Sequence, residues 1–130
     1  MIGVMPFTPG RPLAEAKAEL FKALAHPARI RVLEMLAGRE HTISELADGT
    51  GLELSHLSQQ VSVLRRAGIV DSRRSGNNVI CCLSDPQTAE LLAVARRMLT
   101  ASLRQGQALL AALDGAEDAV SLADSTRPAG

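Results

Sequence analysis

Polar side chains recur along residues 53–66 at a spacing that could bring them against the edges of nucleic-acid bases. Ser55, Gln59, Ser62 and Arg66 follow one another at intervals of three or four residues, which places them on one face of a helix. Glutamine can pair bidentately with adenine, and serine or a neutral histidine can bond to a base or a phosphate. The candidate DNA-contacting residues of this helix are Ser55, His56, Ser58, Gln59, Gln60, Ser62 and Arg66. A face that is merely solvated is the alternative.

A local excess of positive charge follows this segment. The whole chain has 14 basic and 14 acidic residues, so it is not basic overall, but residues 65–76 contain four arginines and one aspartate. Arg73 and Arg74 could neutralise phosphates and release their counterions, while Asn77 and Asn78 carry donors for phosphates or the minor groove. Contacts of this kind position a protein on DNA without reading its sequence.

Cys81 and Cys82 are the two thiols of the chain, and they are adjacent. Successive strand residues face opposite sides, so we expect one thiol in the core and the other toward solvent or a partner subunit. A disulfide between direct neighbours would be strained. Two interpretations stay open: both are small packing residues, or oxidation of the exposed thiol shifts the strand and weakens DNA binding.

The three histidines, His26, His41 and His56, are spaced by fifteen residues and fall in different predicted elements, which is not a metal-binding pattern. We expect His26 to cap or pack a helix, His41 to lie on the surface and His56 to contact DNA. The sequence contains no Ser-His-Asp or Cys-His arrangement in a sensible context and no phosphate-binding glycine loop. We therefore expect no enzyme, no catalytic residues, no metal and no cofactor.

Apolar periodicity predicts the elements that must hold these side chains. Four helices are predicted from runs of helix-forming residues, from the cap at His26-Pro27 and from the glycines at 38, 51 and 68. A long fifth helix begins at Asp85-Pro86. The five helices are expected over residues 13–25, 27–38, 43–51, 54–67 and 86–113. Two β-rich runs, residues 69–74 and 79–83, flank a turn at residues 75–78 and predict a β-hairpin.

Length and composition favour one small domain. The chain has 130 residues and is 46% hydrophobic, which suffices for one modest core. We expect a flexible N-terminus over residues 1–11, the domain over residues 12–114, and a flexible tail over residues 115–130, where Ala, Gly, Asp, Ser and Pro dominate. No apolar run is long enough for a membrane span and no secretory signal is evident, so we expect a cytoplasmic protein without a membrane partner.

Three helices, the last two joined by a tight glycine-containing turn, followed by a hairpin, form the layout of a winged helix-turn-helix. The blocks LFKALAHPARIRVLEML and ISELADGTGLELSHLSQQVSVLRRAGIV, with the hairpin and long closing helix after them, resemble the ArsR/SmtB family of bacterial repressors over about residues 15–105. The resemblance implies a mainly α fold of five helices plus a two-stranded wing. It also implies a homodimer through the first and last helices on a near-palindromic operator in double-stranded DNA.

Apolar residues on those two helices are the expected dimer surface. They are Leu13, Leu20, Leu92, Leu99, Leu103 and Leu110. The alternative is that both helices only cover the core of a monomer.

Metal sensing, which the resemblance would allow, is not expected from the residues present. The family's motif resembles ELCVCDL, whereas this chain has EHTISEL, so Thr42 and Ser44 replace two thiolates. A second family site keeps Asp85 but has Gln87 where a histidine is expected. Glu53 also stands where the family often has a serine N-cap. The effector is therefore unknown.

The function expected from these features is a sequence-specific DNA-binding regulator, a repressor acting as a homodimer. A winged-helix module that binds protein instead of DNA is the alternative that the neutral net charge permits. A thiol-based redox-responsive repressor using Cys81 and Cys82 is another.

Overall fold

The computed structural model describes residues 12–126, with the side chains of residues 12–115. Two compact units follow each other along the chain, one ending at Leu92 and the next beginning at Ala93. The predicted flexible N-terminus and residues 127–130 of the predicted tail lie outside the described residues, and the predicted domain boundaries stay predictions.

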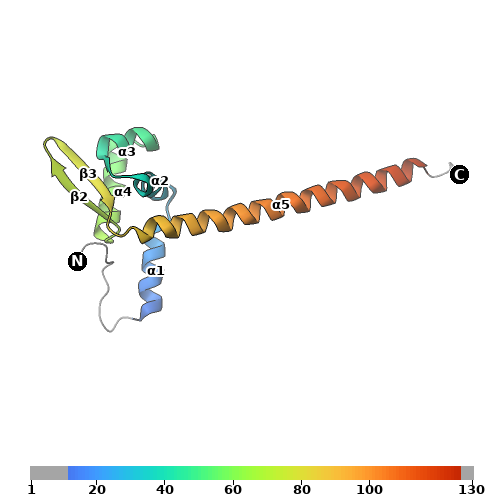
Figure 1. The fold of residues 1–130 in the computed structure, drawn as a ribbon, viewed down its shortest axis with the longest axis horizontal. Coiled ribbons are helices and arrows are strands. Elements are labelled where there is room, and N and C mark those ends of the chain that lie inside the picture. The colour runs from blue at the N-terminus through green and yellow to red at the C-terminus, as the bar shows by residue number, and fades with distance from the viewer. Residues whose placement is uncertain (1–11, 127–130) are drawn as a thin grey trace. The chain divides into compact units, whose positions relative to one another are not determined.

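The five predicted helices are confirmed (Figure 1). They are α1 (Leu13–Leu24), α2 (Pro27–Gly38), α3 (Ile43–Thr50), α4 (Leu54–Arg66) and α5 (Gln87–Thr126). The first unit holds α1 to α4 and the first turns of α5, and the rest of α5 belongs to the second unit.

Local hydrogen bonds explain where the helices begin. His26 Nδ1 accepts a hydrogen bond from the amide of Ala28 at 3.0 Å, so His26 caps α2 as predicted. Thr42 and Glu45 form a reciprocal capping box at α3, with Thr42 Oγ1 accepting from the Glu45 amide at 3.1 Å. Asp85 Oδ1 accepts from the amide of Gln87 at 2.8 Å at the start of α5. Glu53, at the N-cap of α4, makes no side-chain cap bond.

The core of the first unit lies where α2, α3 and α4 meet the sheet. Leu33, Leu46, Leu57 and Leu64 are almost completely buried there, together with Val70 and Cys81 of the strands. Burying each leucine contributes roughly 1.5–3 kcal/mol. Because Leu57 and Leu64 bury one side of α4, the opposite side of that helix is left to solvent.

A three-stranded antiparallel sheet follows the helices, with the strand order β1-β3-β2. The strands are β1 (His41–Thr42), β2 (Val70–Ser75) and β3 (Asn78–Leu83). Figure 1 shows β2 and β3 as the narrow hairpin beside α3 and α4. Ser75 pairs with Asn78, and Gly76 takes a positive φ of 62° in the two-residue turn between them.

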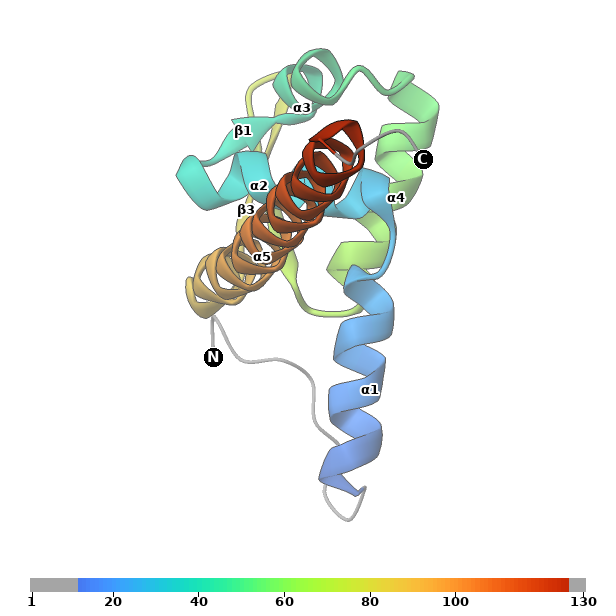
Figure 2. The ribbon, with the colours of Figure 1, turned by 90° about the vertical axis from the view of Figure 1, so that its right-hand side faces the viewer.

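The strand β1 is the element that the sequence analysis missed. It pairs with β3 through His41↔Cys81 and Thr42↔Ile80, directly before α3 (Figure 2). Two residues are too few to show a strand periodicity, so this segment was predicted only as a polar link. The wing is therefore joined to the helical part by backbone pairing as well as by side chains.

The predicted end of the last helix is wrong. The helix α5 continues past Leu113 to Thr126. Three alanines favour helix in this stretch, and the next proline is Pro128, so no proline stops the helix at residue 113. Within residues 12–126, no helix combines the length and hydropathy needed to cross a membrane.

Candidate nucleic-acid interface

The outward side of α4 carries five of its seven predicted DNA-contacting residues. They are Ser55, Ser58, Gln59, Ser62 and Arg66, and each is exposed. No side chain within residues 12–115 is hydrogen-bonded to the side chains of Ser55, Ser58 or Gln59. Their donors and acceptors therefore face solvent and are available to an external partner.

Gln60 makes a side-chain contact inside the chain, and its prediction as a base-reading residue stays a prediction. Its side chain is half-buried, and its Oε1 accepts a hydrogen bond from Arg29 Nε at 3.0 Å. Arg29 also donates from Nη1 to the backbone oxygen of Ala23 at 2.8 Å. Gln60 and Arg29 thus tie α4 to α2 and to the end of α1. The sequence held no signal for this contact, because Arg29 lies 31 residues earlier.

His56 lies on the same side of α4 as Gln60, one turn earlier. Its ring is half-buried and meets His26 edge-to-face, with the ring centroids 6.4 Å apart and the planes at 86°. His26 itself caps α2. Part of the His56 ring is thus used for packing against the helix cap, and the remainder of its surface is open to a DNA contact.

The last turn of α4 concentrates positive charge. Ser62, Arg65 and Arg66 line an open hollow on the surface. Arg66 Nε donates to the backbone oxygen of Ser62 at 3.4 Å, which directs its guanidinium along the helix. Arginines at a helix C-terminus are also favoured by the helix dipole. This hollow thus places the hydroxyl of Ser62 near the two guanidinium groups of Arg65 and Arg66, beside the outward side of α4.

The two wing arginines, predicted alike, have different surroundings. Arg73 donates from both terminal nitrogens to the Glu40 carboxylate, Nη1 to Oε2 and Nη2 to Oε1, each at 2.8 Å. This pair lowers the pKa of Glu40 and raises the pKa of Arg73. Arg74 is exposed and makes no ion pair within the described part of the chain. Arg73 is therefore held by an ion pair, whereas Arg74 has none among the described residues, and the prediction of both as phosphate-binding residues stays a prediction.

The asparagines of the wing lie at its tip. Asn77 is in the two-residue turn and Asn78 begins β3, and both are exposed. Gly76 supplies the positive φ of the turn, and neither asparagine adopts one. Their exposed side-chain amides lie at the end of the hairpin, close along the strands to the exposed Arg74.

The two thiols face opposite sides of β3, as the strand periodicity predicted. Cys81 is fully buried and Cys82 is half-buried. Burial raises the pKa of both thiols, and the carboxylates of Asp71 and Glu40 raise the pKa of Cys82 further. A raised pKa lowers the fraction of reactive thiolate. The surroundings of Cys81 and Cys82 therefore activate neither thiol, and they do not support the redox hypothesis.

The positions that hold metal in the resembled family serve other purposes in this structure. Thr42 caps α3 and Asp85 caps α5. His41 was predicted at the surface, but its side chain is only 11% exposed, with Nδ1 3.0 Å from Glu45 Oε2. Arg39 and His41 lower the pKa of Glu45 to about 2. The described residues contain no group of three or more His, Cys, Asp or Glu side chains that could hold a metal ion.

Four of the six predicted dimer residues are exposed: Leu13 by 60%, Leu99 by 66%, Leu103 by 67% and Leu110 by 62%. Leu20 is half-buried against the core. Leu92 is only 7% exposed and belongs to the core of the first unit, so its assignment to a dimer surface is corrected. The first turns of α5 pack on that core, which removes Leu92 from the exposed seam.

Further exposed apolar residues were missed by the sequence analysis. Phe21 on α1 is 54% exposed, and Met98, Leu109 and Leu113 on α5 are exposed as well. Phe21 lies eight residues after Leu13, so both are on one side of α1, a spacing that could have revealed it. These residues widen the apolar surface that each helix presents.

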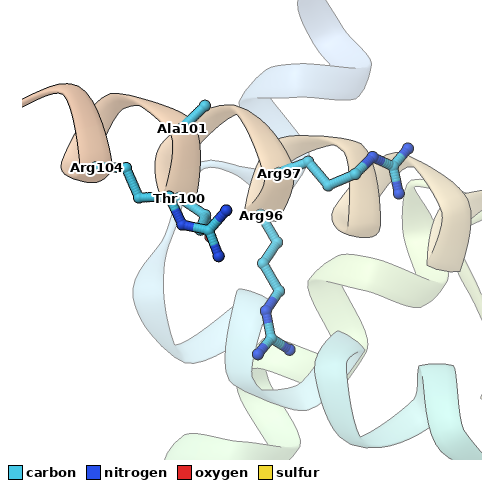
Figure 3. Close-up of a pocket in the computed structure, with 5 residues that line it drawn as sticks. All are labelled: Arg96, Arg97, Thr100, Ala101 and Arg104. Atoms are coloured by element: carbon cyan, nitrogen blue, oxygen red, sulfur yellow. The ribbon is translucent and has the colours of Figure 1, made fainter.

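A second cluster of arginines lies on α5. Arg96, Arg97 and Arg104, with Thr100 and Ala101, line an open hollow on this helix. Figure 3 shows the guanidinium groups of Arg96 and Arg97 leaving the helix in different directions. At 100° per residue, Arg97, Ala101 and Arg104 lie on the opposite side of α5 from Leu99, Leu103 and Leu110. The helix α5 thus has an apolar side opposite Arg97 and Arg104, while Arg96 lies at the edge of that apolar side.

Comparisons with known proteins give the same fold. A model of a helix-turn-helix domain matches residues 24–73. The chain is 54% identical over 100 residues to the helix-turn-helix-type transcriptional regulator Rv0081 of Mycobacterium tuberculosis, covering 76% of this chain and 88% of that protein. It is 38% identical over 91 residues to the biofilm growth-associated repressor of Agrobacterium fabrum, covering 70% and 78% of the two chains.

Solved structures extend this similarity. The crystal structure of Rv0081 from M. tuberculosis aligns with a TM-score of 0.67 over 74% of this chain and 97% of that one, at 54% identity. The homodimeric winged helix-turn-helix DNA-binding domain of Mb0332 from Mycobacterium bovis, described as a possible ArsR-family regulator, aligns with a TM-score of 0.66 at 26% identity. That alignment covers 75% of this chain and 95% of that one. The predicted winged helix-turn-helix is thus confirmed.

Proposed function

The chain belongs to the ArsR/SmtB-type family of winged helix-turn-helix transcriptional regulators, and from this premise we propose that it is a homodimeric repressor that binds a near-palindromic operator. Its relatives are named as a helix-turn-helix-type transcriptional regulator and as a repressor. Our proposal adds that the protein recognises a specific DNA sequence, that it binds as a symmetric homodimer and that it represses transcription. We assign no catalytic role to the chain.

The observation that carries the proposal is the solvent-facing side of α4. Ser55, Ser58 and Gln59 are exposed there while Leu57 and Leu64 anchor the opposite side. An α-helix fits the major groove, where glutamine can read adenine and serine can bond to a base or a phosphate. Gln59 is the residue that we propose reads a base pair directly.

Phosphate contacts on both sides of this helix would fix its position. Ser62 and Arg66 continue the outward side of α4, and Arg74, Asn77 and Asn78 extend it onto the wing. We propose that these residues bind the DNA backbone and carry the salt dependence of binding. His56 would add a contact from the part of its ring that does not pack on His26.

A second copy of the chain would supply the other half-site. The exposed leucines of α1 and α5, Leu13, Leu99, Leu103 and Leu110, support a two-fold dimer because large apolar side chains gain from leaving water. Two reading helices about one DNA turn apart would require an operator with matching symmetry. Such a role would place the protein in the cytoplasm, with DNA and its own copy as partners. Any effector is unknown.

Selection of bound duplexes from a random library, followed by fluorescence anisotropy on the selected sequence, tests the function. The expected result is a near-palindromic consensus that is bound with steep salt dependence. Recovery of an asymmetric site would contradict the dimer. The protein-binding alternative predicts that no duplex is bound even at low salt, which would end the proposal.

A further inference from the structure

The ion pair between Glu40 and Arg73 crosses the sheet. Pairing of His41 with Cys81, extended by one residue, places Glu40 beside Cys82, and Asp71 pairs with Cys82 from the other strand. Arg73 lies two residues after Asp71, so Glu40 and Arg73 are on one face of the sheet with β3 between them. Both charges act on the Cys82 thiol, which supports this arrangement. A carboxylate next to β1 thus reaches over the central strand to the wing.

The geometry of this pair is the geometry that a phosphate would need. Both terminal nitrogens of Arg73 are bonded to the two oxygens of Glu40, each at 2.8 Å. Arginine binds carboxylate and phosphate with the same bidentate fork, so the two ligands compete for the guanidinium. Arg74, one residue later, faces the opposite side of the sheet and has no such carboxylate among the described side chains.

We propose that the Glu40 carboxylate competes with DNA phosphates for the guanidinium of Arg73. Each wing then binds the DNA backbone through Arg74 and not through Arg73. The inference rests on the proposed DNA-binding function and adds a residue that limits the affinity for any duplex. The Glu40 and Arg73 side chains are 50% and 54% exposed. Removal of the carboxylate would leave the guanidinium at the surface, open to a new anion.

The test is a salt titration of binding to a labelled duplex of arbitrary sequence, with five proteins and one control variant. They are the wild type and the variants Glu40→Gln, Arg73→Ala, Arg74→Ala and the double variant Glu40→Gln/Arg73→Ala. Glu34→Gln is the matched control, because Glu34 is exposed on α2 and has no ion pair within residues 12–115. Thermal unfolding of each variant checks that it is folded.

Glu40→Gln should steepen the slope of log K against log salt by about 0.9 per bound subunit. For each bound subunit, a tenfold rise in salt should then weaken DNA binding by the variant about eightfold more than binding by the wild type. Arg73→Ala alone should leave the slope unchanged, and in the double variant it should cancel the gain. Arg74→Ala should flatten the slope by about the same amount. Glu34→Gln should match the wild type.

An unchanged slope for folded Glu40→Gln, or a flattening by Arg73→Ala equal to that by Arg74→Ala, would overturn the inference while leaving DNA binding intact. Weaker binding by Glu40→Gln would also overturn it, because the ion pair would then serve to position the wing. Failure of the wild type itself to bind the duplex at low salt would overturn the proposed function, and this inference with it.

Discussion

At the scale of single residues, neighbours of the same type have different roles because their partners differ. Gln59 faces solvent, whereas Gln60 accepts a hydrogen bond from Arg29. Arg74 is free among the described residues, whereas Arg73 is held by Glu40. Residue type alone could not separate the members of either pair, because each difference depends on a residue about thirty positions away in the chain.

The two glutamines should therefore respond differently to removal. Gln59→Ala should weaken binding to the selected operator by about 1–3 kcal/mol and relax preference at one base pair, with little change in the melting temperature. Gln60→Ala should lower stability by about 1 kcal/mol, because it leaves Arg29 Nε without its acceptor. Anisotropy on operator and substituted duplexes, together with thermal unfolding, measures both effects. Equal losses on operator and random DNA for Gln59→Ala would argue against base reading.

Glu45 should make stability depend on pH in the acidic range. Hydrogen bonds from Arg39 and His41 lower its pKa from 4.5 to about 2 in the folded state. A lowered folded-state pKa means that the stabilisation is present above the unfolded value and is lost as pH falls toward about 2. Glu45→Gln should therefore melt below the wild type at neutral pH.

This difference in melting temperature should close as the pH is lowered, because the wild-type carboxyl becomes neutral as well. Thermal unfolding by circular dichroism across the acidic range measures it, with Glu34→Gln as the control without this dependence. A gap that stays constant with pH would show that Glu45 acts through packing and not through its charge.

At the scale of elements, the turn between α3 and α4 sets the angle of the outward helix. Gly51 ends α3 with a φ of 73°, in the left-handed region, and its amide donates to the oxygen of Ala47. Thr50 Oγ1 accepts from the Leu52 amide at 3.3 Å, so the turn is closed on both sides of the glycine. A residue with a Cβ is disfavoured at that φ.

Gly51→Ala should lower the free energy of unfolding by about 1–2 kcal/mol, because alanine is strained in the left-handed region. Gly38→Ala is the matched control, since Gly38 has no positive φ and an added Cβ would meet no atom within 4 Å. It should be neutral or stabilising by up to about 1 kcal/mol. Denaturant unfolding of the two variants compares them. Equal stability would contradict the strain.

Most of the fold could be predicted from the sequence because local signals marked its elements. Pro27, Gly51, Gly68 and the Gly76 turn separated the helices and strands close to their observed bounds. The strand β1 could not be predicted, because its pairing with β3 joins positions forty residues apart. The outward side of α4 followed from periodicity, but the ties of Gln60 and Arg73 did not, since both are long-range side-chain contacts.

At the scale of the whole molecule, the two ends of the described chain carry apolar surface that its own core does not use. Leu13 and Phe21 are exposed on α1, as are Leu99, Leu103 and Leu110 on α5. Exposed apolar surface gathered on one side of a helix is typical of an interface. The opposite side of α5 would remain in contact with water when the apolar side is covered.

Leu103→Lys combined with Leu110→Lys should convert the proposed dimer to a monomer, because two charges would have to be buried in an apolar interface. Ala108→Lys, on the opposite side of α5, is the control and should leave the dimer intact. Sedimentation velocity at micromolar concentration measures the mass, and operator binding should fall with dimerisation. A wild-type protein that sediments as a monomer would remove the basis for this prediction.

The sheet order β1-β3-β2 leaves β2 as an outer strand whose backbone donors and acceptors on one side have no neighbour in the described sheet. Exposed outer strands invite self-association by strand addition, and charged side chains are a common defence against it. Asp71, Arg73 and Arg74 are exposed on this strand. Replacing its arginines with β-branched apolar residues would thus lower solubility as well as weaken DNA binding. The charged side chains of the wing oppose aggregation of the protein when it is not bound to DNA.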